Sequence, residues 1–491
     1  MIWTRCAVAG LVLASSLPLV SLSAQTSLAF PTEAFGDRRA RLAQQVGRAA
    51  VVMPSAYLIR SEARQDPDFW YLTGVDSRYA MLVIVPTEES ARDVLFLPEL
   101  HQFAGAQLPI DDPRFREAAW NRPEGRLAAG PDAERVTGVG ETYPVDQALD
   151  RMRDLLSGID TVYFPIDDET LYAPRGLRPP RSMRQQMRDA LAQAMPNTVF
   201  RDVTPLLRRM RLVKDRYEVA ALRRAADISA RSFVTAMQQT RAGLNDLAIA
   251  GVMEAFWKGE GAPRAAFAPI VSSGPGSLLL YTLRAERYDY ADRVMRDGEL
   301  LYIDYGAAEV DMYASDVCRT FPVSGRFTAE QRRLYQMVLE AQEAALAEIR
   351  PGVMMKQVIR AAAEVFRRHG LEQYEDIERM GAERVWGVMP SPTYWLARNG
   401  DLTRYSGARG TGVRDLGHHI GLDALDSRDY SVPLQPGMVF TVEPKLYVPA
   451  LGMAIMIEDM ILVTEDGYEN LSAAAPKTVE EIERTMNGTD H

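Results

Sequence analysis

The sequence LYIDYGAAEVDMYASDVCRTF, residues 301–321, places an acidic residue in each of two apolar segments. The alternation of side chains predicts two β-strands joined by a short turn near Glu309–Asp311. Asp304 lies on one face of the first strand, and Asp316 and Cys318 share a face of the second. A carboxylate buried without a partner is very costly, and two neighbouring carboxylates also repel each other. A divalent cation between Asp304 and Asp316 would remove both costs, so this hairpin is predicted to form half of a metal site.

Three later segments carry the remaining candidate ligands. The segments GHHIGLD, MVFTVEP and MAIMIEDMILV contain His418, Glu443 and Glu458, and both glutamates interrupt apolar, strand-like sequence. Oxygen ligands combined with one imidazole suit Mn²⁺, Co²⁺, Zn²⁺ or Fe²⁺. With Asp304 and Asp316 the set offers four carboxylates and one imidazole, which is enough for two ions. The sequence therefore predicts a centre with two divalent cations.

These motifs together resemble the metallopeptidases of the methionine aminopeptidase, prolidase and aminopeptidase P group, over roughly residues 201–471. The resemblance implies the pita-bread fold, in which helices cover a curved antiparallel sheet. Upstream, RQDPDFWYLTG (residues 64–74) and LFLP (residues 95–98) resemble the N-terminal domain of the aminopeptidase P and creatinase branch. The expected fold class is therefore α/β (α+β), with a smaller mixed α/β domain ahead of the catalytic domain.

The resemblance also implies a role for each ligand. Asp304 would bind one ion, Asp316 and Glu458 would bridge both ions, and His418 and Glu443 would bind the other. In this group the two ions share a water or hydroxide that attacks the scissile carbonyl, and Glu443 would handle its proton. The implied cofactors are two divalent ions, with manganese first and cobalt, zinc or iron as alternatives. The implied reaction removes the N-terminal residue that precedes a proline.

Several departures from the family pattern fall around one substrate pocket. Peptide-cleaving members carry two further histidines, and here Leu280 or Tyr281 and Leu425 occupy those positions. Met456 stands where the family has an arginine. The hairpin also has one residue more than usual between its two aspartates, and we place the extra residue in the turn. Nearby groups such as Tyr281 or Arg414 could take over stabilisation of an oxyanion.

The chain is long enough for several domains, with 491 residues. We predict a signal peptide at 1–24, the N-terminal domain at 25–203, the catalytic domain at 204–482 and a tail at 483–491. Residues 126–135 are expected to be a polar connection. Downstream, the order helix, helix, hairpin occurs twice, which predicts two similar halves whose strands meet in one antiparallel sheet.

The first 24 residues have the pattern of an export signal. Arg5 precedes the apolar run Ala7–Val20, and small residues lead to a cleavage site after Ala24. This predicts a periplasmic or secreted protein without stable membrane insertion, with a retained anchor as the alternative. Cleavage would leave Cys318 as the single cysteine, so no internal disulfide is expected.

The net charge of the chain limits the classes of molecule that it is expected to bind. A net charge of −10, without a basic segment, argues against nucleic acid. The expected partner is a peptide or small-molecule substrate, and the resemblance implies a homodimer or homotetramer. Three functions remain open: an Xaa-Pro aminopeptidase, a metal hydrolase of a non-peptide amide or ester, and a metal-stabilised protein that binds without catalysis.

Overall fold

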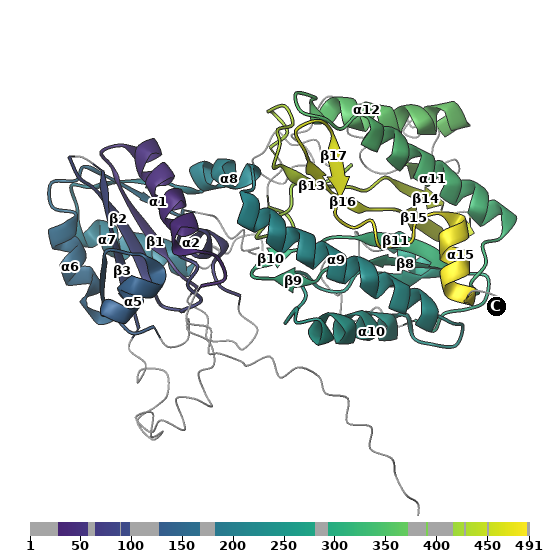
Figure 1. The fold of residues 1–491 in the computed structure, drawn as a ribbon, viewed down its shortest axis with the longest axis horizontal. Coiled ribbons are helices and arrows are strands. Elements are labelled where there is room, and N and C mark those ends of the chain that lie inside the picture. The colour runs from purple at the N-terminus through teal and green to yellow at the C-terminus, as the bar shows by residue number, and fades with distance from the viewer. Residues whose placement is uncertain are drawn as a thin grey trace, which may run out of the picture.

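The computed structural model describes residues 28–56, 64–88, 90–98, 127–166, 182–279, 293–371, 389–390, 416–426, 429–448 and 451–488. The predicted signal peptide and the pocket positions Leu280, Tyr281 and Arg414 lie outside these ranges. Among the described helices, none combines the length and the apolar character needed to cross a bilayer. Figure 1 shows an N-terminal domain and a larger catalytic domain, with helix α8 running between them.

The N-terminal domain contains a six-stranded mixed sheet in the order β4-β3-β2-β1-β5-β6. Its strands are β1 (Ala50–Pro54), β2 (Met81–Pro86), β3 (Ala91–Leu97), β4 (Glu141–Pro144), β5 (Thr161–Phe164) and β6 (Val199–Asp202). Strands β1 to β3 pair antiparallel, whereas β4, β5 and β6 join in parallel. Its helices are α1 (Thr32–Val46), α2 (Pro67–Thr73), α5 (Pro131–Thr137), α6 (Ala148–Leu155) and α7 (Met183–Ala194).

Strict alternation along β1 sends its side chains into two different cores. Val51 and Met53 pack in the cluster that includes residues of α1 and α2. Ala50 and Val52 pack in the cluster that includes residues of α6 and α7. Because successive side chains of a strand point to opposite faces, a sheet covered on both sides needs apolar residues at every position. The sequence of β1, AVVMP, has an apolar residue at every position.

Helix α5 differs from the polar connection expected at 126–135. Gly130 precedes the helix, Pro131 begins it, and Gly138 ends it with a positive φ. Ala133 and Val136 are its buried apolar residues, and charged residues fill its outer positions. A helix of seven residues with so few apolar positions gives only a weak periodic signal.

The catalytic domain repeats an order of helices followed by strands. Its first half contains α8 (Thr204–Leu212), α9 (Arg216–Gln239), α10 (Asp246–Gly259), β7 (Val271–Ser273), β8 (Leu300–Asp304), β9 (Glu309–Val310), β10 (Tyr313–Ala314) and β11 (Cys318–Pro322). Its second half contains α11 (Ala329–Ala347), α12 (Met355–Phe366), β12 (Met389–Pro390), β13 (Val439–Val442), β14 (Lys445–Val448), β15 (Met453–Met456), β16 (Asp459–Val463), β17 (Tyr468–Asn470) and α15 (Val479–Asn487). Short helical turns follow β7, at Gly274–Leu279, and α12, at Arg367–Leu371.

The strands of the catalytic domain form antiparallel ladders that meet at the centre. The described ladders are β11-β8-β7, β12-β14-β15, β13-β16-β17 and the small hairpin β10-β9. A bridge between Cys318 and Glu458 links the strands of the two halves. In Figure 1 the strands lie between α9 and α10 on one side and α11 and α12 on the other. This arrangement agrees with the predicted helix-covered antiparallel sheet.

The central hairpin is more elaborate than two strands with one short turn. Strands β8 and β11 pair from Asp304 opposite Cys318, and the chain between them forms the second hairpin β9-β10. Its tip has positive φ at Asp311 and Met312, as a two-residue type I′ turn requires. The registers of the two ladders differ by one residue, so the chain forms a bulge beside Asp304. The extra residue in the turn stays a prediction; the register change that the structure describes lies beside Asp304.

A close approach fixes the residue that follows this bulge. The amide of Gly306 donates to the carbonyl of Val317 at 2.9 Å. A Cβ atom added to Gly306 would lie 2.5 Å from Cβ of Val317, closer than two carbons can pack. Glycine therefore allows the two chains to approach just after Asp304.

Helix α15 extends through most of the tail expected at 483–491. The side chain of Thr478 accepts from the amide of Glu481, which forms a capping box at the start of the helix. Ile482 is fully buried, and the Asn487 side chain donates to the carbonyl of Gly325 at 2.8 Å. Capping and packing therefore carry the helix past the predicted boundary.

Ion pairs connect the N-terminal domain to the loop that follows His418. Arg211 of α8 contacts Asp68 of α2 at 2.7 Å and Asp423 at 2.8 Å. Arg64 also contacts Asp423 at 2.8 Å. Burial alone would raise the pKa of Asp423, but Arg211 and Arg64 outweigh it and hold that pKa below its usual value. The N-terminal domain thus helps to position the loop after His418.

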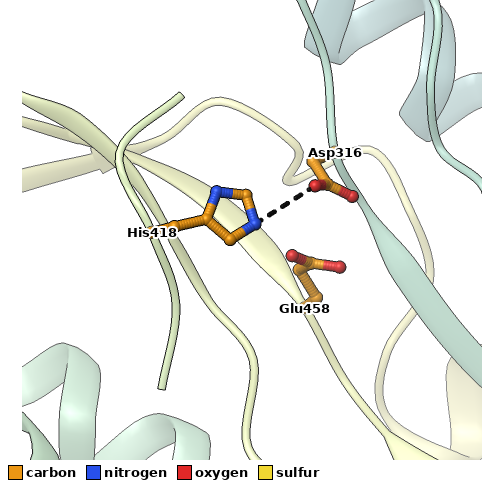
Figure 2. A group of neighbouring side chains, drawn as sticks. All are labelled: Asp316, His418 and Glu458. Atoms are coloured by element: carbon orange, nitrogen blue, oxygen red, sulfur yellow. Dashed lines mark ion pairs between the residues drawn. The ribbon is translucent and has the colours of Figure 1, made fainter. Parts of the chain in front are cut away.

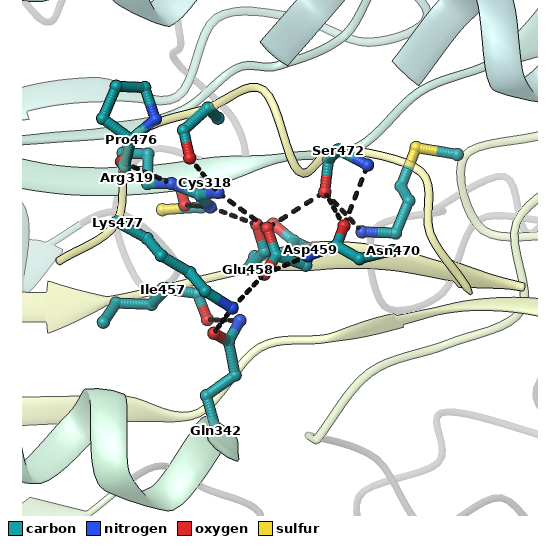
Figure 3. Close-up of polar contacts among 12 residues, drawn as sticks. Cys318, Arg319, Gln342, Ile457, Glu458, Asp459, Asn470, Ser472, Pro476 and Lys477 are labelled. Atoms are coloured by element: carbon teal, nitrogen blue, oxygen red, sulfur yellow. Dashed lines mark hydrogen bonds and ion pairs between the residues drawn. The ribbon is translucent and has the colours of Figure 1, made fainter. Parts of the chain in front are cut away.

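A buried polar network connects strands β11 and β16 (Figure 3). Arg319 contacts Asp459 at 2.7 Å, and both side chains are fully buried. Arg319 also donates to the carbonyls of Cys318 at 2.8 Å and Glu458 at 2.6 Å. Lys477 contacts the other oxygen of Asp459 at 2.9 Å. The network therefore joins β11 to β16 at the bridge between the two halves.

Replacing Arg319 by methionine is expected to destabilise the catalytic domain strongly. Asp459 would lose its main buried cation, and breaking a buried pair from one side costs about 3–5 kcal/mol. Thermal and urea unfolding followed by circular dichroism would measure the loss. The control is Arg333→Met, which removes an exposed pair with Glu330 and should leave unfolding nearly unchanged. Equal stability of the two variants would contradict the prediction.

Candidate metal centre

The register of one long hairpin places Glu443 opposite Glu458. Val442 pairs with Asp459 in the β13–β16 ladder, and Lys445 pairs with Met456 in the β14–β15 ladder. The two ladders keep the same register, so the interruption between them brings Glu443 across from Glu458. Pro444, which follows Glu443, has no N–H to donate and therefore breaks the ladder here.

Gln342 of α11 fills this interruption. Its side-chain amide donates to the carbonyl oxygens of Val442 and Ile457, both at 3.2 Å. These carbonyls belong to the residues that immediately precede Glu443 and Glu458. The helix thus satisfies backbone groups that the broken ladder leaves open, and it holds both glutamates in place.

His418 enters from a loop that packs tightly on β13. Gly417 has a φ of 151°, and a Cβ atom there would lie 1.7 Å from the carbonyl oxygen of Thr441. The His418 amide donates to the Thr441 hydroxyl at 3.1 Å, and the Thr441 amide donates to the His418 carbonyl at 2.9 Å. The Nδ1 atom of His418 lies 3.4 Å from the carbonyl oxygen of His419. A bond from Nδ1–H to this carbonyl leaves Nε2 as the ligand atom, as in many metal sites.

The side chains of Asp316, His418 and Glu458 converge (Figure 2). One ligand atom from each lies within 4.8 Å of the others. His418 Nε2 is 3.4 Å from Asp316 Oδ2 and 3.6 Å from Glu443 Oε1. Asp304 ends β8, where it pairs with Cys318, and Cys318 in turn bridges to Glu458. The structure therefore brings four of the five predicted ligands into direct proximity and places Asp304 on the adjacent strand, buried like the others.

The buried acids disturb one another. Burial raises the pKa of Glu458 well above its usual value, and the charges of Asp316 and Glu443 raise it further. Burial also raises the pKa of Asp316, although His418 opposes this. For Glu443, Lys445 and His418 outweigh burial and lower the pKa. The site therefore holds more negative charge than its protein partners neutralise.

Two oxygens of this cluster fit the coordination of a divalent cation. Oδ1 of Asp316 and Oε2 of Glu458 are buried, and neither has a hydrogen-bond partner within the described part of the chain. Burying such atoms is unfavourable unless they are paired or coordinate a metal. Several carboxylate oxygens with one imidazole nitrogen form a donor set suited to Mn²⁺, Zn²⁺, Co²⁺ or Fe²⁺. The residues therefore fit the divalent cations predicted from the sequence.

The two candidate pocket residues that the structure describes differ in environment. Met456 is fully buried, and the Tyr302 hydroxyl donates to its sulfur at 3.0 Å. Leu425 is 55% exposed, in the loop after His418. His419, the neighbour of His418, is buried and stacks on Tyr430 with ring centroids 5.3 Å apart. Burial lowers the pKa of His419 to about 3, so this ring is a neutral packing residue.

Two polar residues of the centre were not identified from the sequence. Thr441 donates through its hydroxyl to Oε1 of Glu443 at 3.2 Å, and Lys445 contacts Oε2 of Glu443 at 2.5 Å. Both are two residues from Glu443, one on each side. The side-chain period of a strand could have indicated that all three share a face. Pro444 between them obscured that pattern.

Comparison with known proteins gives the family. Residues 220–465 match the model of metallopeptidase family M24, and residues 35–163 match the aminopeptidase P N-terminal domain. The Xaa-Pro aminopeptidase of Escherichia coli (strain K12) is 31% identical over 474 residues, covering 92% of this chain and 97% of that relative.

Solved structures show the same architecture over nearly the whole chain. Zn-substituted E. coli aminopeptidase P in complex with product has a TM-score of 0.69 at 28% identity, covering 93% of this chain and 98% of that one. Proline aminopeptidase P II from Yersinia pestis has a TM-score of 0.71 at 27% identity, covering 93% and 100%. These matches confirm the pita-bread fold and the predicted relationship. The chain belongs to metallopeptidase family M24 and carries the aminopeptidase P N-terminal domain ahead of its catalytic domain.

Proposed function

We propose that the protein is a metal-dependent Xaa-Pro aminopeptidase with two divalent cations in its centre. The main support is the buried cluster of Asp316, His418 and Glu458, with its unpartnered oxygens, in a chain related to Xaa-Pro aminopeptidases along nearly its full length. Asp304, at the end of β8, and Glu443, opposite Glu458, complete the donor set. Manganese is the proposed metal, with cobalt, zinc or iron as alternatives.

The chemistry follows from the donor set. When bound, such cations polarise the scissile carbonyl and lower the pKa of water. Asp316 and Glu458 would hold the cations through their carboxylates, and His418 would hold them through Nε2. Glu443 is the proposed proton acceptor for the attacking water, and the Thr441 hydroxyl fixes its Oε1 at 3.2 Å.

The proposed substrate is a peptide with proline in the second position. A prolyl amide has no N–H, so its recognition depends on shape and on the carbonyl. The pocket is proposed to diverge from the family pattern because Leu425 and Met456 have no N–H or O–H to donate to an oxyanion. The side chains at these two positions would therefore give no hydrogen bond to an oxyanion, and the cations or other groups would stabilise the developing charge.

Cellular location and assembly are also part of the proposal. The signal-like pattern of residues 1–24 supports export to the periplasm or medium. The proposed assembly is a homodimer or homotetramer, on the basis of the family resemblance.

Activity should depend on both metal and proline. Metal-loaded protein is expected to cleave Ala-Pro-Ala but not Ala-Ala-Ala, as measured by release of free alanine. Glu443→Gln should lower kcat/KM by about 10²–10⁴-fold, because it removes the proton acceptor while keeping the size of the side chain. Glu465→Gln, on an exposed turn, is the control. No cleavage of either peptide by protein with confirmed metal content would refute the proposed activity; hydrolysis of amide or ester substrates alone would favour the non-peptide hydrolase.

Metal removal should lower stability. A ligand at about 100 times its Kd adds about 2.7 kcal/mol to the free energy of unfolding, so dialysis against a chelator should lower Tm and Mn²⁺ should restore it. Glu458→Gln should lose most of this Mn²⁺ response. Without metal it should be no less stable than the wild type, because repulsion from Asp316 is gone. Glu343→Gln, exposed on α11, is the control and should keep the response.

Export predicts a processed N-terminus. Expression of the full chain in a bacterium should give a protein that begins at Gln25, as measured by intact mass and by fractionation of the periplasm. Ala24→Arg should block processing, because the cleavage site requires a small residue. Recovery of the wild-type chain with residues 1–24 still attached would contradict a cleaved signal.

A further inference from the structure

Four side chains share one face where the long hairpin is interrupted. Glu443 and Lys445 are two residues apart, as are Met456 and Glu458. Lys445 lies directly opposite Met456 in the β14–β15 ladder. Opposed residues of an antiparallel pair project from the same face, and so do residues two apart in a strand. Lys445 therefore reaches the centre from the same face as the two glutamates.

The contact with Lys445 gives the two carboxylate oxygens of Glu443 different environments. Its Nζ lies 2.5 Å from Oε2, and its side chain is only 13% exposed. The other oxygen, Oε1, faces Nε2 of His418 at 3.6 Å and accepts from Thr441 at 3.2 Å. One oxygen therefore points to the ligand cluster, and the other is held by an ammonium group. Charge-assisted bonds of this kind are short and strong, so this orientation is fixed.

The charge of Lys445 also acts on the rest of the centre. It interacts electrostatically with Asp316 and Glu458 as well as with Glu443. The carboxylates of Asp304, Asp316, Glu443 and Glu458 would balance two divalent cations. The ammonium group then adds one positive charge beside them. Met456, its cross-strand neighbour, is buried and uncharged.

We propose that Lys445 is a positioning residue of this centre: it restricts Glu443 to one metal-binding oxygen and keeps an excess positive charge next to the cations. The proposal rests on the metal-dependent function proposed above. The excess charge opposes cation binding, but it favours a transition state in which negative charge develops. The protein therefore gives up metal affinity and gains rate.

Lys445→Met tests whether Lys445 lowers the metal affinity and raises the catalytic rate. Without the ammonium group, both Glu443 oxygens can bind the cation and no neighbouring charge repels it. Metal affinity, measured on metal-free protein by competition with a chelator, should rise by about tenfold or more. Cleavage of Ala-Pro-Ala should show kcat lowered by about tenfold to a hundredfold, with KM changed much less. The visible absorption of bound Co²⁺ should also change, because the coordination of Glu443 changes.

Two further variants separate this role from a purely structural one. Lys445→Arg keeps the charge and the contact, so it should recover most of the wild-type metal affinity and Co²⁺ spectrum. Lys258→Met, on the exposed side of α10, is the matched control and should leave both unchanged. If Lys445→Met does not fold, Lys445→Gln replaces it with the same expectations.

The outcomes are distinguishable. Weaker or unchanged metal binding in Lys445→Met, or a Co²⁺ spectrum identical to that of the wild type, would overturn the role of Lys445. If wild-type protein with confirmed metal does not cleave Ala-Pro-Ala, the proposed reaction fails. Tighter metal binding in Lys445→Met would then still support Lys445 as the residue that positions Glu443.

Discussion

Mutual repulsion among buried carboxylates is the constraint on which the rest of the catalytic domain depends. Asp316, Glu443 and Glu458 lie around one imidazole, and burial of Glu458 raises its pKa well above the usual value. A sheet does not gather such groups without a counter-charge, because each unpaired buried charge costs several kcal/mol. The orphaned oxygens of Asp316 and Glu458 mark where that counter-charge is needed. Divalent cations meet this need, and binding them is then coupled to folding.

The strand that carries Glu458 separates two polar networks. Glu458 and Asp459 are neighbours, so their side chains point to opposite faces. Glu458 faces the ligand cluster, whereas Asp459 faces Arg319 and Lys477. The second network is fully paired within the protein, and it also holds the carbonyl of Glu458. The backbone of the centre is therefore fixed without metal, and only the ligand face depends on the cations. This division allows a preorganised site despite its internal repulsion.

The sequence predicted the elements whose signals are local. Isolated acids in apolar strands identified Asp304, Asp316, Glu443 and Glu458, and the glycine-rich turn identified His418. The details that depend on register were not predictable: the bulge beside Asp304 needs the pairing of two ladders, and periodicity within one strand does not reveal it.

Helix α5 was missed because a short helix with few apolar residues has weak periodicity. The end of α15 was missed because no fully buried apolar residue follows Ile482 in this helix. Lys445 was missed because its contact with Glu443 can be predicted only if the two-residue period of the strand continues through Pro444.

The same two-residue period places the Lys445 ammonium group on the face of the metal ligands. The resemblance implies an arginine where Met456 stands, and Lys445 lies directly across the ladder from it. A side chain directly opposite in an antiparallel pair occupies the same face as the one it replaces. Lys445 thus places a positive charge on the same face as the implied arginine, without the planar group of donors that an arginine would offer. An ammonium group on a flexible stem can hold Glu443, but it offers less directional hydrogen bonding to a substrate. Lys445 therefore supplies a positive charge on the face where the resemblance implies one, with a side chain of different shape.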